Sequence, residues 1–102
     1  MQERVSAFLE EFDLATDVAS RMLDLVSETG EMAKEVLTAT NYGENDFTPT
    51  ENWEEEIGDC LFTLCALAEE TDIDLDAALQ KVLQKYRQRF ADKGDISSGN
   101  AR

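Results

Sequence analysis

Two pairs of acidic residues have a spacing that could hold a metal ion. Glu28 and Glu31 belong to the stretch "ETGE", and Glu56 and Asp59 belong to "EIGD". Residues three positions apart lie on one side of an α-helix, so each pair can direct two carboxylates at a common point. Two such pairs on neighbouring helices would supply four hard oxygen donors, which suit Mg²⁺ or Mn²⁺ and not zinc.

The first pair also has a simpler interpretation as part of a solvated acidic face. The chain of 102 residues contains 23 Asp and Glu, so a Glu-x-x-Glu spacing arises readily by chance. On a helical projection Glu31 lies nearly opposite the apolar stripe of its segment, and Glu28 lies at the border of that stripe. Taken alone, this pair favours the solvated face.

The second pair stands next to the most apolar stretch of the chain, "CLFTLCALA" at residues 60–68. A helix that is apolar all round is expected to be buried all round. Glu56, Asp59 and Thr63 then form a narrow polar strip between apolar faces. Burying a carboxylate without compensation is unfavourable, so this strip needs a cation, a hydrogen-bond network or a proton. Here a functional role is favoured.

Basic residues recur every four positions in "ALQKVLQKYRQRF", at Lys81, Lys85 and Arg89. The helix macrodipole or pairing with acids of a neighbouring helix could explain Lys81 equally well. Lys85 and Arg89, at the border of the apolar face, are better placed to bind phosphate oxygens. Acids that hold a metal and bases that hold phosphate together suit attack of water on a phosphoanhydride.

The elements that must position these residues are helices. Proline occurs once and no β-branched run is present, so the chain is expected to be all-α. Asp17 or Thr16, Thr50 and Asp74 are expected to cap the last three of four helices. The expected helices cover about residues 2–12, 18–40, 51–70 and 75–92, in one domain of residues 1–93 with a flexible tail at 94–102.

Composition limits the possible partners and compartments. The net charge of −14 argues against nucleic acid or an anionic membrane as the main partner. It indicates a solvated acidic coat or a protein that binds cations. No apolar run reaches the roughly 20 residues that a membrane-spanning helix needs, and no signal peptide opens the chain, so a cytoplasmic location is expected.

The residue inventory excludes several chemistries. The absence of histidine excludes Ser-His-Asp and Cys-His nucleophile systems and imidazole-based zinc sites. Cys60 and Cys65 are five positions apart on one expected helix and cannot bridge each other there. Both are interpreted as reduced core residues.

The stretches "LVSETGEMAKEVL" and "EEEIGDCLFTLCALAEETDIDLDAALQKVLQKYRQRF" resemble the MazG-like nucleoside triphosphate pyrophosphohydrolases. The resemblance covers residues 20–90. It implies an all-α, four-helix protomer that assembles into an oligomeric helical bundle, as a homodimer or homotetramer. It also implies cleavage between the α- and β-phosphates of a (deoxy)nucleoside triphosphate, which releases the monophosphate and pyrophosphate.

The same resemblance implies roles for individual residues. Mg²⁺, or Mn²⁺, would be held by the catalytic acids Glu28, Glu31, Glu56 and Asp59. The basic residues of the family's last helix fall on Lys85 and Arg89. Many relatives carry an asparagine shortly before that lysine, whereas this chain has Leu83 nearby, so the base and sugar preference is left open.

Trp53, beside the one long loop at residues 41–50, is a candidate platform for a nucleobase or a core anchor. Two further functions are kept open. One is hydrolysis of another nucleotide such as phosphoribosyl-ATP. The other is a non-catalytic acidic bundle that binds metal or a basic partner.

Overall fold

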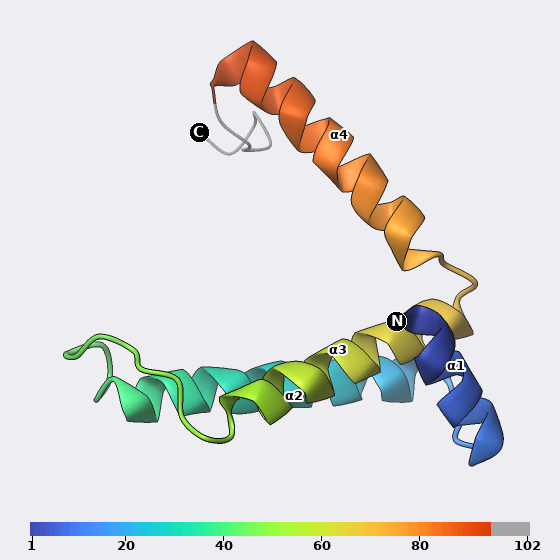
Figure 1. Ribbon diagram of the computed structural model, residues 1–102, viewed down its shortest axis with the longest axis horizontal. Coiled ribbons are helices and arrows are strands. Elements are labelled where there is room, and N and C mark those ends of the chain that lie inside the picture. Colours follow the sequence, from blue (N-terminus) through green and yellow to red (C-terminus); the bar gives the residue numbers. More distant parts are fainter. Residues whose placement is uncertain (95–102) are drawn as a thin grey trace. The chain divides into compact units, whose positions relative to one another are not determined.

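The computed structural model describes residues 1–94, which form four helices and no strand (Figure 1). The all-α prediction is confirmed. The tail predicted at residues 94–102 lies, after Gly94, outside the described residues. The helices are α1 (Gln2–Glu11), α2 (Val18–Ala39), α3 (Trp53–Glu70) and α4 (Leu75–Lys93).

The chain divides into two compact units, and the first comprises Met1–Asp72. In this unit α2 and α3 lie side by side and run in opposite directions, and α1 packs against α3 (Figure 1). The ring of Phe8 on α1 meets Phe62 on α3 edge to face, with centroids 5.8 Å apart. Leu9, Cys65 and Ala66 are buried in this core. The antiparallel pair is the element that can bring the two acidic motifs together.

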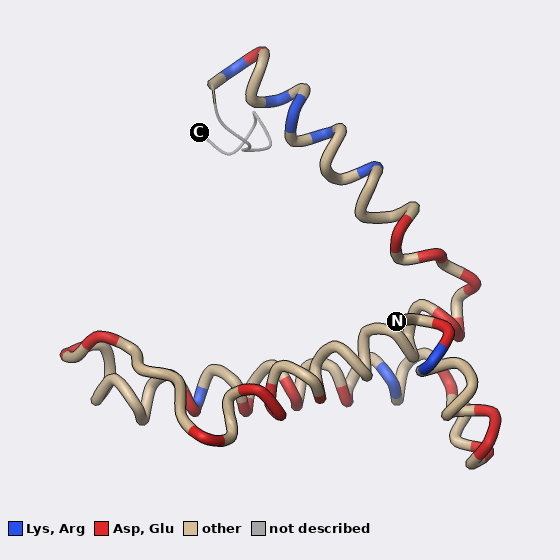
Figure 2. The backbone as a smooth tube through the Cα atoms, viewed as in Figure 1, with Lys and Arg blue, Asp and Glu red and all other residues tan. Residues whose placement is uncertain are grey.

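The second unit begins at Ile73 and contains α4. This helix ends at Lys93 and is capped by Gly94, whose left-handed φ of 81° suits glycine and whose amide donates to the carbonyl of Phe90. Basic residues recur along α4, whereas acidic residues predominate in the first unit (Figure 2). No helix in the described part of the chain is both long and apolar enough to span a membrane.

Two of the three predicted N-terminal helix caps are present in the structure, and the third is not. Asp17 accepts the amide of Ser20 at 2.7 Å, and Asp74 accepts the amide of Asp76 at 3.0 Å. Both predictions are confirmed. The prediction for Thr50 is wrong, because α3 begins two residues later than expected, at Trp53, with Asn52 as its N-cap. The Thr50 hydroxyl instead donates to the Glu35 carboxylate.

The prediction that residues 60–68 of α3 are buried on all sides is also wrong. Ile57, Leu61 and Leu64 are 45 %, 37 % and 41 % exposed. Their spacing of four and three residues places them on one face of the helix. Within the first unit, α3 packs only against α1 and α2, so this third side is left uncovered.

A buried ion pair joins α2 to the end of α3. The guanidinium of Arg21 donates to the Glu70 carboxylate, with Nη2 3.0 Å from Oε2. It also donates to the Leu14 carbonyl at 2.9 Å, and the Thr16 amide donates to Glu70 at 3.2 Å. The two side chains are only 9 % and 11 % exposed. This network fixes the α1–α2 connection and one end of the α2–α3 pair.

Arg21→Ala is therefore expected to destabilise the protein by roughly 3 kcal/mol, because it leaves a buried carboxylate without its partner. Urea unfolding followed by circular dichroism measures this change. Arg4→Ala, at an exposed arginine of α1, is the matched control and should change stability by less than about 0.5 kcal/mol. Equal unfolding midpoints for the two variants would contradict the structural role of the pair.

Candidate metal centre

Three of the four acids predicted to bind metal converge between α2 and α3. Carboxylate oxygens of Glu28, Glu31 and Glu56 all lie within 4.8 Å of one another. Helix α2 supplies the first two from adjacent turns, and α3 supplies the third. The convergence depends on the antiparallel packing, because the two motifs are far apart in the sequence.

Two of these carboxylates are poorly solvated. Glu28 and Glu56 are half-buried, and the Oε2 atom of each is shielded from solvent without a hydrogen-bond partner among the described residues. Buried polar atoms in proteins nearly always have a partner, and leaving one unsatisfied is costly. Negatively charged oxygens that lack a donor and point to a common place fit a divalent cation that prefers oxygen ligands.

The electrostatic environment agrees with this interpretation. Loss of hydration raises the pKa of Glu28, and the charges of Glu31, Asp59 and Glu56 raise it further. Loss of hydration also raises the pKa of Glu56, as do the nearby charges of Glu31 and Glu35. The causes are therefore burial and like-charge repulsion, and a cation would relieve the repulsion.

Asp59 takes a less central position than predicted. Its side chain is exposed, and it does not belong to the group of carboxylates within 4.8 Å of one another. Its charge still contributes to raising the pKa of Glu28 and of Glu56. Thr63, the third member of the predicted polar strip, is buried and donates to the Asp59 carbonyl at 3.0 Å. Its hydroxyl is thus used within the helix.

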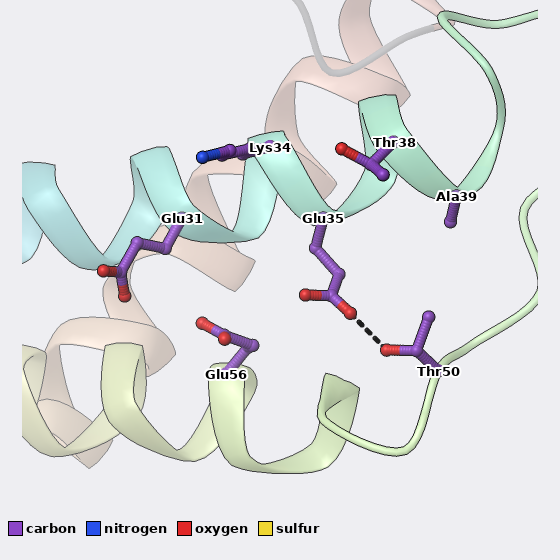
Figure 3. Close-up of a pocket in the computed structure, with 7 residues that line it drawn as sticks. All are labelled: Glu31, Lys34, Glu35, Thr38, Ala39, Thr50 and Glu56. Atoms are coloured by element: carbon purple, nitrogen blue, oxygen red, sulfur yellow. Dashed lines mark hydrogen bonds between the residues drawn. The ribbon is translucent and has the colours of Figure 1, made fainter.

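A cleft of about 380 Å³ opens beside the cluster (Figure 3). Figure 3 shows Glu35 on α2 reaching towards Thr50, which lies before α3. Glu35 was not among the predicted site residues, although the spacing of Glu28, Glu31 and Glu35 by three and four residues places all three on one side of a helix. The residues that line the cleft are Glu31, Lys34, Glu35, Thr38, Ala39, Thr50 and Glu56.

The predicted phosphate-binding residues lie on α4, in the second unit. Lys81 and Lys85 are exposed, and Arg89 is half-buried. The ammonium of Lys85 lies 5.4 Å from the centre of the Tyr86 ring. These residues share one helix, as expected, and their role towards phosphate stays a prediction.

Trp53 lies at the first position of α3, where its ring packs against Phe47 with centroids 4.9 Å apart. This contact anchors the 41–52 connection to the start of α3. A role of Trp53 in base binding stays a prediction.

Comparison with known proteins assigns the chain to a family. Residues 17–92 match the model of the MazG nucleotide pyrophosphohydrolase domain. This range includes both acidic motifs and the basic residues of α4. The chain belongs to the MazG nucleotide pyrophosphohydrolase family. Enzymes of this family generally depend on a divalent metal, in keeping with the three-carboxylate cluster of this MazG domain.

A relative and a solved structure that are similar to this chain both carry the name YpjD and come from Bacillus subtilis. The chain is 43 % identical to the uncharacterized protein YpjD of strain 168 over 75 residues, which are 71 % of this chain and 66 % of that relative. A crystal structure of B. subtilis YPJD, described as a candidate pyrophosphatase, matches with a TM-score of 0.71 and 36 % identity. The structural match covers 86 % of this MazG chain and 90 % of that one.

The acidic cluster should make the metal-free protein more stable as the pH falls towards the ordinary glutamate pKa. The raised pKa of Glu56 means that the folded state binds more protons than the unfolded state above a pH of about 4.5, the ordinary value. Stability should therefore decrease as the pH rises through this window. With EDTA present, Glu56→Gln should raise the melting temperature at pH ~7, and this gain should shrink as the pH falls towards ~5.

Glu54→Gln is the matched control, because Glu54 is exposed on the same helix turn. It should leave the melting temperature nearly unchanged. Added Mg²⁺ should stabilise the wild-type protein and the control but not Glu56→Gln. A metal-free Glu56→Gln protein that is less stable than wild type at neutral pH would show that Glu56 is already compensated.

Proposed function

We propose that the protein is a cytoplasmic, Mg²⁺-dependent hydrolase of (deoxy)nucleoside triphosphates that releases the monophosphate and pyrophosphate. Mn²⁺ is the expected substitute for Mg²⁺. Membership of the MazG family supports hydrolysis of a nucleotide pyrophosphate bond. The observation that carries the proposal is the convergence of Glu28, Glu31 and Glu56, with two buried oxygens that have no hydrogen-bond partner within residues 1–94.

The four predicted acids would share the task of holding the metal. Glu28, Glu31 and Glu56 would supply the inner ligands, because their oxygens already converge. Asp59, which is exposed one turn along α3 from Glu56, would complete the set when substrate and metal are bound. A bound Mg²⁺ neutralises charge on phosphate oxygens and lowers the pKa of an attacking water.

In the proposed reaction, water adds its oxygen to phosphorus and loses a proton, and the bond between the α- and β-phosphates breaks. The chain needs no nucleophilic side chain for this step, in agreement with its lack of histidine. Lys85 and Arg89 would hold the leaving pyrophosphate through charge-assisted hydrogen bonds, and Lys81 is a third candidate. Their regular spacing on α4 suits a row of phosphate oxygens.

The cleft beside the acids is the part of the site that the sugar and base would reach. It offers the hydroxyls of Thr38 and Thr50 and the charged groups of Lys34 and Glu35. Trp53 is the proposed stacking residue for the base, at the start of the helix that carries Glu56. Base preference would follow from these groups, which can donate and accept hydrogen bonds.

The active form is proposed to be a homodimer or homotetramer. The uncovered face of α3, formed by Ile57, Leu61 and Leu64, supports this assembly, because such a row is costly to leave in water. Exposed apolar residues also occur on α2, at Val18, Met22 and Val26. Light scattering should give the mass of two or four chains, and Leu64→Asp should shift it towards that of one chain. A wild-type protein with the mass of one chain would contradict the assembly.

Incubation with a panel of nucleoside triphosphates and Mg²⁺ tests the reaction. Monophosphate and pyrophosphate are the expected products, and diphosphate with orthophosphate would contradict the bond assignment. Glu56→Gln and Asp59→Asn should each lower kcat/KM by roughly 100-fold, because they weaken the hold on the metal. The larger loss is expected for Glu56→Gln, because Asp59 lies outside the converging group.

Glu54→Gln is the control for a general effect of removing negative charge and should keep wild-type activity. Circular dichroism should show that all variants retain their helices. Full activity of Glu56→Gln would overturn the proposed site. Turnover of phosphoribosyl-ATP in preference to every triphosphate would assign another substrate, and metal binding without any turnover would indicate a non-catalytic bundle.

A further inference from the structure

Glu35 lies beside the acidic cluster without belonging to it. Its carboxylate is not one of the three whose oxygens lie within 4.8 Å of one another. It lines the same cleft as Glu31 and Glu56, from the turn of α2 that follows Glu31. This half-buried carboxylate therefore faces the cleft as a separate group.

The hydroxyl of Thr50 holds the Glu35 side chain in place. It donates to Oε1 of Glu35, and Figure 3 shows the second carboxylate oxygen turned towards the side of the cleft where Glu56 lies. A carboxylate has two oxygens with about four acceptor positions, so one hydroxyl donor leaves most of them available. Glu35 is thus an oriented acceptor that already binds one hydroxyl group and can accept another.

The connection that carries Thr50 is itself held by several contacts. At its start, the buried hydroxyl of Thr40 accepts the amide of Gly43 at 3.0 Å. At its end, the Trp53 amide donates to the Thr50 carbonyl at 3.2 Å, and the Trp53 ring packs against Phe47. Thr50 therefore meets Glu35 from a supported backbone, which favours one orientation of the carboxylate.

The cleft follows α2 away from the acidic cluster. Glu31, Glu35 and Thr38 all line it, and their spacing of four and three residues places them on one side of the helix. Glu35 lies four residues, or about 6 Å, beyond Glu31 along the axis. In a nucleotide the sugar is bonded directly to the α-phosphate, and the base lies farther out. A substrate whose α-phosphate is held at the metal would thus bring its sugar hydroxyls to Glu35.

We propose that Glu35 determines sugar specificity by accepting hydrogen bonds from the hydroxyl groups of a ribose, while Thr50 orients it. An ionised carboxylate only accepts hydrogen bonds, so it suits hydroxyl groups and not the negatively charged phosphates. Acidic side chains bind the ribose 2′-hydroxyl in the same way in dinucleotide-binding folds. The protein therefore prefers ribonucleotides to 2′-deoxyribonucleotides. This inference rests on the function proposed above, because it concerns the same nucleotide substrate.

The test compares each ribonucleoside triphosphate with its 2′-deoxy counterpart, in the presence of Mg²⁺. The wild-type protein should have the higher kcat/KM for the ribonucleotide. Glu35→Ala should lower that value by about 10- to 100-fold, the usual effect of a hydrogen bond to a charged group, and lower the value for the deoxyribonucleotide much less. Thr50→Val, which keeps the size of the side chain, should shift the ratio in the same direction. It provides a second variant if Glu35→Ala does not fold.

Glu51→Ala is the matched control, because it removes an exposed carboxylate next to Thr50 and should leave both kcat/KM values unchanged. Calorimetry without nucleotide should give Glu35→Ala the Mg²⁺ affinity of the wild type. An equal loss for both sugars in Glu35→Ala would overturn the proposal. So would a Mg²⁺ affinity weakened by about tenfold or more, because Glu35 would then act through the metal.

Binding of the product separates this inference from the proposed reaction. Calorimetry with ribonucleoside and deoxyribonucleoside monophosphates, in the presence of Mg²⁺, requires no turnover. If the protein hydrolyses no triphosphate but binds the ribonucleotide more tightly, and Glu35→Ala removes that preference, the sugar site stands and the reaction fails. If the protein hydrolyses both sugars equally well, the reaction stands and the sugar site fails.

Discussion

Repulsion between carboxylates at the α2–α3 interface is the constraint on which the rest of this structure depends. Glu28, Glu31 and Glu56 approach to within 4.8 Å, and none of the ion pairs found among residues 1–94 involves them. Two of their oxygens are also shielded from water without a partner in the described part of the chain. Such an arrangement is unfavourable by itself, and a divalent cation would convert the repulsion into attraction. The candidate chemistry follows from this one place.

The remainder of the first unit holds these acids in position from both sides. Arg21 and Glu70 join the beginning of α2 to the end of α3, which are adjacent because the helices are antiparallel. Near the other end, Glu35 bonds to Thr50 just before α3 begins. The acidic cluster lies between these two connections. Helix α1 covers one side of α3 through Phe8, and the side with Ile57, Leu61 and Leu64 is left open.

The sequence predicted the helices well because its local signals were strong. Asp17 and Asp74 can each satisfy free amides at a helix start, and both do so. Pairing of the two acidic motifs was also predictable, because residues three apart share a helix face. Thr50 was misassigned because its hydroxyl has a distant partner, Glu35, that no local pattern reveals. The exposure of Leu61 and Leu64 was missed because apolar periodicity identifies a face that needs covering but not what covers it.

The contacts across helices could not be derived from the sequence for the same reason. Cys60 reads as an ordinary core cysteine until the packing of α2 against α3 places its thiol 3.1 Å from the thioether of Met32. The most direct test of the central claim is an anomalous difference map from a crystal of the protein with Mn²⁺. The account predicts a peak within coordinating distance of Glu28, Glu31 and Glu56. An absence of density there, with Mn²⁺ bound only elsewhere on the acidic surface, would contradict it.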